Sequence, residues 1–118
     1  MASDEDLLSH LYSCFNARNI DGALAIMHPD IAWDSELEGP VHGKDGVRGY
    51  LARQWEMINS HAEPMRYSAC GDGTINVEVR LTARDLDGNL LIEKVSGHSF
   101  QIENGLIRRF DVRPGLGA

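Results

Sequence analysis

The sequence predicts an α+β fold in which helices come first and an antiparallel sheet follows. Two observations support this prediction. Apolar residues recur with helical spacing in the first half of the chain, whereas from about residue 64 onward they alternate with polar residues, as in strands. Turn signals that contain glycine then divide the second half into four strands. This order is typical of helices packed on one face of a curved sheet.

The first helix is predicted from its cap and its apolar stripe. Ser3 and Asp6 resemble a capping box, in which each side chain bonds to the backbone of the other residue. Leu7, Leu11 and Phe15 then recur every fourth residue. This spacing places them on one face of a helix of about four turns.

A second, short helix is predicted over residues 20–27. Asn19 can cap its start, and Pro29 ends it because proline disfavours helical geometry at the preceding residue. Residues 30–35 alternate as a short strand. One face of that strand holds Ile31, Trp33 and Ser35, and the other face holds Asp30, Ala32 and Asp34.

A polar loop and a third helix are predicted before the sheet. Residues 36–43 contain the turn signal Gly39-Pro40 and are predicted as the loop. Residues 45–59 are predicted as a helix because their apolar residues form a clean stripe. The remaining strands are predicted over residues 64–70, 75–85 and 90–103 and, after the turn at Asn104-Gly105, over residues 106–113, with a bulge expected at Ser96-Gly97.

The last two strands form the one acid–base pair that spacing alone predicts. Asn-Gly is typical of a two-residue type I′ turn, which fixes the pairing register of the flanking strands. With Asn104-Gly105 as the turn, His98 faces Asp111 on the same side of the sheet. A carboxylate orients an imidazole and raises its basicity, so this pair could transfer protons. The alternative is a hydrogen-bonded pair that stabilises the sheet or a dimer interface.

Composition restricts the classes of partner. The 118 residues are predicted to form one domain over 1–118, and their net charge of −7 argues against nucleic acid. The acidic N-terminus is unlike a signal peptide and no apolar run is long enough to span a membrane, so we expect a cytoplasmic protein without a membrane partner. Cys14 and Cys70 lack metal or redox spacing. The sequence contains no zinc, phosphate-loop or dinucleotide motif, so no cofactor is expected.

Several short motifs together resemble the nuclear-transport-factor-2-like superfamily, and most closely its bacterial SnoaL-like, ketosteroid-isomerase-like branch. The resemblance implies a cone, in which a strongly curved, mainly antiparallel mixed sheet wraps around helices and leaves an apolar pocket at its open end. It also implies a homodimer formed through the sheet. The motifs are NARNIDGAL at residues 16–24, HPDIAW at 28–33, GKDGVRGY at 43–50, NGLI at 104–107 and FDV at 110–112.

The resemblance also implies roles at individual positions. In the steroid isomerases of this branch a catalytic Asp follows the first strand, where this chain has Ser35, and the two oxyanion-hole residues match Leu11 and His98. These three departures make steroid isomerisation unexpected. The cyclases of the branch are more similar, because their last strand ends in an aromatic-Asp-Val pattern like residues 110–112 and a pocket His lies near His98.

Two functions follow as hypotheses. The first is a cofactor-independent cyclase, isomerase or lyase that transfers protons on a small apolar molecule, with His98 and Asp111 as catalytic residues. The second is a non-catalytic module for ligand binding or dimerisation. Core packing is the alternative role for the aromatic pocket residues, above all for Trp55. The predicted pocket residues are Tyr12, Phe15, Trp33, Ser35, Tyr50, Trp55 and Phe100.

Overall fold

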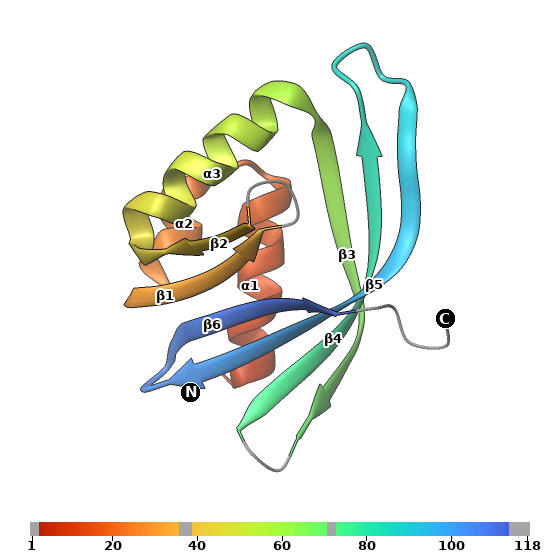
Figure 1. The fold of residues 1–118 in the computed structure, drawn as a ribbon. Coiled ribbons are helices and arrows are strands. Elements are labelled where there is room, and N and C mark those ends of the chain that lie inside the picture. Colours follow the sequence, from red (N-terminus) through yellow and green to blue (C-terminus); the bar gives the residue numbers. More distant parts are fainter. Residues whose placement is uncertain (1–2, 36–38, 71–72, 114–118) are drawn as a thin grey trace.

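The computed structural model describes residues 3–35, 39–70 and 73–113, and it confirms the α+β class. Three helices accompany one six-stranded sheet in this described part, with the strand order β2-β1-β6-β5-β4-β3 (Figure 1). β1 pairs with β6 in parallel, and every other pairing is antiparallel. The elements are α1 (Asp4–Asn16), α2 (Ile20–Ala25), β1 (Met27–Ser35), β2 (Gly39–His42), α3 (Gly43–Met57), β3 (Asn59–Ala69), β4 (Thr74–Arg84), β5 (Leu90–Glu103) and β6 (Leu106–Arg113).

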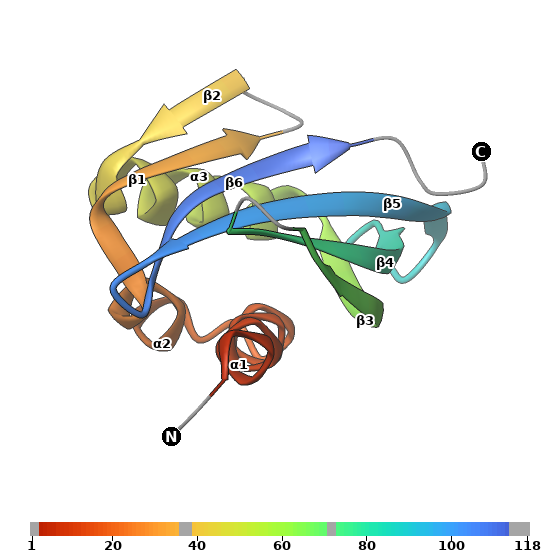
Figure 2. The same ribbon diagram turned by 90° about the horizontal axis from the view of Figure 1, so that it is seen from below.

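The sheet is strongly bent, and the helices lie on its concave side (Figures 1 and 2). α1 packs along β3, whereas α3 packs against β1 and β2. Buried apolar residues from both helices and from the strands form one continuous core. Its fully buried members include Leu8 of α1, Ile31 of β1, Val47 of α3, Val79 of β4 and Ile107 of β6. No helix in the described ranges is long and apolar enough to cross a membrane.

The caps of the first two helices are confirmed. Ser3 and Asp6 form the reciprocal capping box, and the Asn19 side chain accepts a hydrogen bond from the backbone N–H of Gly22. α2 is shorter than predicted, however, and ends at Ala25. Pro29 does not follow a helix but lies inside β1, which begins three residues earlier than the alternation predicted.

The predicted loop over residues 36–43 is wrong for its second half. Residues 39–42 form β2, which pairs with β1 from Ser35↔Gly39 to Ala32↔His42. β2 is an edge strand of the sheet, where proline is tolerated because one side of the strand needs no backbone donor. Gly39 has φ of 80°, so the turn signal was real but marked only the start of this strand.

The meander of four strands is confirmed, but the expected bulge at Ser96-Gly97 is wrong. Pairing runs without interruption from Val79↔Ser96 to Glu78↔Gly97. Between β5 and β6 the register shifts in β6, where Ile107 pairs with Ile102 and Arg109 pairs with Gln101. Arg108 is therefore the extra residue of a bulge, which follows the first two residue pairs after the tight turn. Likewise, β3 begins at Asn59 rather than at residue 64.

This bulge overturns the predicted pairing of His98 with Asp111. His98 lies opposite Val112, and Asp111 lies opposite Ser99. Because side chains alternate between the two faces of a strand, one inserted residue moves Asp111 to the convex face while His98 stays on the concave face. There the Asp111 carboxylate accepts a hydrogen bond of 2.8 Å from Nε of Arg109. The two predicted catalytic side chains are thus not a pair.

Candidate functional site

A cavity of about 170 Å³ lies between α1, α3 and the concave face of the sheet. A cavity of about 150 Å³ holds one benzene molecule, so this space suits a molecule of one or two rings. Its wall is mostly apolar and aromatic. The residues that line it include Leu11, Tyr12, Phe15, Ala23, Met27, Trp33, Asp34, Tyr50, Leu51, Gln54, Ile58, Ser60, Ala62, Leu81, Ile92, Lys94, His98, Phe100, Phe110 and Val112.

A cluster of rings forms the inner wall of the cavity. Phe110 of β6 lies at its centre, with ring centroids 4.3 Å from Trp33, 4.8 Å from His98 and 5.1 Å from Phe100. Tyr12 of α1 covers this group and meets Phe100 edge to face. Period-two alternation explains the arrangement, because His98 and Phe100 are two residues apart on β5 and share its concave face.

Tyr12 and His98 form the polar centre of this cluster. The Tyr12 hydroxyl and Nδ1 of His98 are 2.7 Å apart and share a hydrogen bond. Both side chains are buried, with 5% and 8% of their surfaces exposed. The bond satisfies two polar groups that would be costly to bury alone, and it joins α1 to β5 across the core.

Burial keeps both groups of this pair uncharged at neutral pH. Desolvation, with a smaller contribution from the positive charge of Lys94, lowers the pKa of His98 to about 4. Desolvation likewise raises the pKa of Tyr12 well above its usual value, with a smaller contribution from Tyr67. A neutral imidazole and a protonated phenol can each donate one hydrogen bond and accept another. The pair can therefore bind the oxygen of a carbonyl or hydroxyl group.

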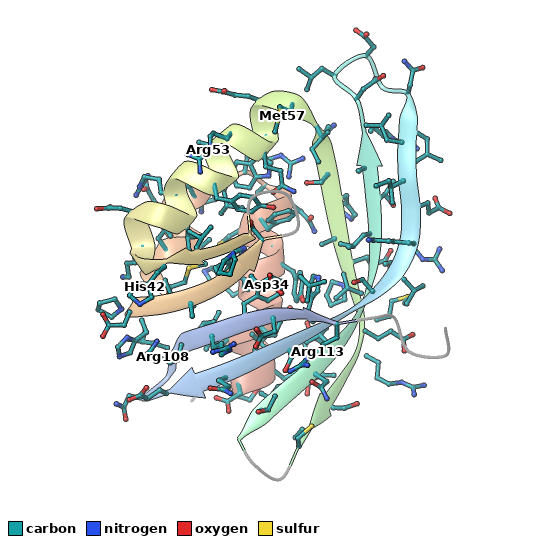
Figure 3. The ribbon with its side chains drawn as sticks, in the orientation of Figure 1. Asp34, His42, Arg53, Met57, Arg108 and Arg113 are labelled. Carbon is teal, nitrogen blue, oxygen red and sulfur yellow. The ribbon has the colours of Figure 1, made fainter. Side chains whose placement is uncertain are left out.

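Further polar side chains lie around the cavity. Asp34 stands near the C-terminal end of β1 (Figure 3), where its Oδ2 accepts a hydrogen bond of 3.3 Å from the backbone N–H of Val112. Alternation predicts Asp34 on the other face of β1 from Trp33, but Asp34 is among the residues that line the cavity. Ser60 Oγ is buried and has no hydrogen-bond partner within the described residues. Gln54 and Lys94 complete the charged and amide-bearing part of the lining.

Five of the seven predicted pocket residues line the cavity, namely Tyr12, Phe15, Trp33, Tyr50 and Phe100. The other two lie elsewhere. Ser35 is buried and its hydroxyl donates a hydrogen bond of 2.6 Å to the carbonyl oxygen of Gly39. Trp55 packs behind the cavity, with its ring 5.6 Å from that of Phe15 and 5.1 Å from the guanidinium carbon of Arg18.

Sequence reasoning missed Lys94, Gln54 and Ser60 as lining residues. A signal for Lys94 was present, because it stands four residues before His98 on the same strand and so shares its face. Gln54 and Ser60 gave no such signal, since their positions depend on how α3 packs against the sheet. No cluster of three metal-ligating side chains occurs in the part of the chain that the structure describes.

The comparison with protein families decides the family. The model of the SnoaL-like domain matches residues 8–112. The chain belongs to the SnoaL-like family. A comparison with curated protein sequences gives no match.

Solved structures resemble this SnoaL-like chain over most of its length. A protein of nuclear-transport-factor-2-like type and unknown function from Burkholderia pseudomallei K96243 has a TM-score of 0.84 and 22% identity, covering 97% of this chain and 92% of that one. TerC, co-crystallised with polyporic acid, has a TM-score of 0.81 and 22% identity over 92% and 88% of the two chains. A protein with a ketosteroid-isomerase-like fold from Catenulispora acidiphila DSM 44928, in complex with trimethylamine, has a TM-score of 0.81 and 13% identity over 94% and 86% of the two chains. These likenesses confirm the fold.

Proposed function

We propose that this SnoaL-like protein binds a small, mostly apolar molecule in the cavity and holds a carbonyl or hydroxyl oxygen of it at Tyr12 and His98. The observation that carries this proposal is a neutral, hydrogen-bonded polar pair set in an aromatic wall beside a cavity of about 170 Å³. Small-molecule sites are typically concave and apolar with a few placed polar groups. The co-crystallisation of TerC, which has the same fold, with polyporic acid supports a similar use of the fold.

The apolar wall and the polar pair have different tasks in this proposal. The rings of Trp33, Phe100 and Phe110 offer surface that gains free energy when it leaves water, whatever the ligand's detailed structure. The Tyr12–His98 pair adds orientation, because an oxygen that reaches it finds a directed donor held on two buried side chains.

The binding test uses 2-naphthol, which combines two fused rings with one hydroxyl. Ligand binding should raise the melting temperature of the wild-type protein with increasing 2-naphthol concentration. Leu81→Trp should remove the shift, because Leu81 lines the cavity and a larger side chain fills it. Leu86→Trp is the matched control, since Leu86 is 65% exposed at the β4–β5 turn. An equal shift in the Leu81→Trp variant would contradict binding in this cavity.

Proton transfer on a carbonyl compound is the second candidate function, and the Tyr12–His98 bond is the observation that favours it. In the tautomer in which Nδ1–H donates to the Tyr12 oxygen, the Tyr12 hydroxyl is able to donate to a ligand carbonyl. The neutral Nε2 can then accept a proton from the carbon beside that carbonyl and return it at another carbon. A low pKa makes His98 a weak base, so binding to the Tyr12 donor must stabilise the enolate.

Deuterium exchange separates binding from catalysis. In D₂O, 2-tetralone incubated with a catalytic protein would gain deuterium beside its carbonyl faster than in buffer, as mass spectrometry would detect. Tyr12→Phe and His98→Gln should each slow the exchange, because each removes one half of the pair. If deuterium exchanged only at the buffer rate while the ligand raised the melting temperature, the protein would bind the ligand without catalysing this proton transfer.

We also propose a homodimer formed through the sheet. Apolar side chains on two of its strands support this proposal, because Met65 of β3 and Val95 of β5 are 39% and 40% exposed. Burial in a partner subunit would remove this apolar surface from water. Sedimentation equilibrium should therefore give a mass near twice 13.1 kDa, and Val95→Glu should weaken the assembly. A monomer at all concentrations up to about 100 μM would contradict it, since a specific interface normally binds more tightly.

A further inference from the structure

The position of Lys94 points to the charge of the ligand. Lys94 pairs with Leu81 in β4, and His98 pairs with Val77, so register and alternation place both β5 side chains on the concave face. Both residues also line the cavity. His98 lies in the buried half of β5, whereas Lys94 lies in its exposed half. Lys94 therefore stands on the cavity wall between the inner ring cluster and solvent.

A lysine is an unusual residue for this wall. The chain has a net charge of −7 and only two lysines, Lys44 and Lys94. Of the lining residues within the described part of the chain, Lys94 is the one with a permanent positive charge. Its aliphatic stem can cover the apolar wall while the ammonium stays hydrated at the mouth. A ligand anion could meet the ammonium there without losing all its own water, which keeps the desolvation cost low.

The two charged residues of the described lining favour one position for an anionic group of the ligand. The positive charge of Lys94 is felt at His98, where it adds to burial in lowering the pKa of the imidazole. Asp34 is the acidic residue of the described lining, and it lies on β1, two strands away from β5 in the sheet. An anionic ligand group is therefore attracted towards β5 and repelled from β1.

We propose that the natural ligand of this cavity carries a carboxylate, and that Lys94 binds this carboxylate at the mouth while the rings of the ligand occupy the apolar interior. The inference rests on the proposed binding function and adds the chemical class of the ligand to it. Lys94 already makes a further interaction within the protein. Lys94 also lies in the exposed half of β5, where water competes with the carboxylate, so the preference for an acid is moderate.

The test compares 6-hydroxy-2-naphthoate with 6-hydroxy-2-naphthamide, which has nearly the same shape without the charge. Isothermal titration calorimetry at pH 7 should show the acid binding about fivefold more tightly than the amide, as for a partly solvated ion pair. Lys94→Met should remove this preference and leave the affinity for the amide within about twofold, because methionine keeps most of the stem. Added salt should weaken binding of the acid alone.

Lys44→Met is the matched control, because it removes the same charge from a lysine outside the cavity lining. This variant should keep the preference for the acid. If the wild type binds acid and amide equally, or if Lys94→Met keeps the preference, the carboxylate inference is wrong while binding of the amide still supports the proposed function. If neither probe binds to the wild type, the proposed function fails for this class of ligand and the inference fails with it.

Discussion

The two halves of β5 belong to one continuous strand but differ in how far their residues are buried. From Ser96 to Phe100 every residue is buried, whereas from Leu90 to Val95 every residue is exposed. The inner half pairs with β4 on one side and with β6 on the other, from Gly97↔Arg113 onward. Among the described residues, the outer half pairs with β4 alone, and it extends beyond the end of β6 (Figure 1).

The environment of a side chain on β5 therefore depends on which other elements cover that part of the strand. His98 and Lys94 are four residues apart on the same face. The ring of His98 is covered by Tyr12 and Phe110 and remains neutral, whereas Lys94 reaches solvent. A single strand thus supplies the cavity with a polar group inside and a charged group outside.

The largest effect should come from truncating a ring in the inner half. Phe100 is 1% exposed, and Phe100→Ala removes a ring that contacts Tyr12, His98 and Phe110. We expect the free energy of unfolding to fall by about 3–5 kcal/mol. Leu91→Ala in the outer half, where the side chain is 53% exposed, should change it by less than about 0.5 kcal/mol. Urea denaturation measures both variants, and similar losses would break the contrast between the halves.

The next effect is the pH dependence that His98 imposes. The pKa of His98 is about 4 in the folded protein, whereas the unfolded chain has the ordinary value of 6.5. The unfolded chain therefore takes up the proton first as the pH falls. Stability from the neutral ring is full above pH 6.5 and is lost towards pH 4, by about 3 kcal/mol in total. Denaturation curves over this range should show a shallower slope for His98→Gln. If His98→Gln lost stability with falling pH as steeply as the wild type does, groups other than His98 would be responsible for that loss.

Removing only the hydroxyl at the centre of the pair should have a smaller effect. Tyr12→Phe keeps the ring but leaves Nδ1 of His98 buried without its partner. We expect a loss of about 1–3 kcal/mol in the free energy of unfolding. The double variant Tyr12→Phe, His98→Leu should lose less than the sum of the single variants, because both polar groups are then absent. Additive losses would show that the hydrogen bond contributes little.

The smallest effect is expected at Asp111, which faces away from the cavity beside the inner half. Its ion pair with Arg109 involves a half-exposed guanidinium, and such pairs contribute at most about 1 kcal/mol. Asp111→Asn should therefore change stability little and leave the affinity for 2-naphthol unchanged. Calorimetry checks this prediction, and a tenfold loss of affinity would mean that Asp111 acts on the ligand after all.

Much of the fold could be predicted from the sequence, because it depends on local signals. The Ser3 and Asn19 caps, the apolar stripes of the helices and the turn at Asn104-Gly105 all lie where the sequence indicated. Signals of this kind need no knowledge of tertiary structure. Five aromatic lining residues were also predicted, but the pocket itself was implied by the family resemblance. Phe110, the centre of the ring cluster, was missed because the bulge turns it inward.

The site could be predicted less well, because it depends on contacts between distant segments. Tyr12 and His98 are 86 positions apart, and only the packing of α1 against the sheet brings them together. The pairing of His98 with Asp111 failed for a different reason: the rule for two-residue turns assumes that both strands continue without an inserted residue. Nothing in the residues around Arg108 reveals the bulge.

Arg108 has a consequence for how such a site can evolve. Two interactions hold this inserted residue, a hydrogen bond from its guanidinium to the carbonyl oxygen of Asp30 and an ion pair with Glu103. It lies near the start of β6 (Figure 3), two and three residues before Phe110 and Asp111, whose direction it sets. If Arg108 joined the regular pairing instead of forming the bulge, Asp111 would lie opposite His98 and Phe110 would turn outward. The gain or loss of such a bulge, rather than substitution of the cavity residues themselves, could therefore exchange one set of cavity side chains for another within the same fold.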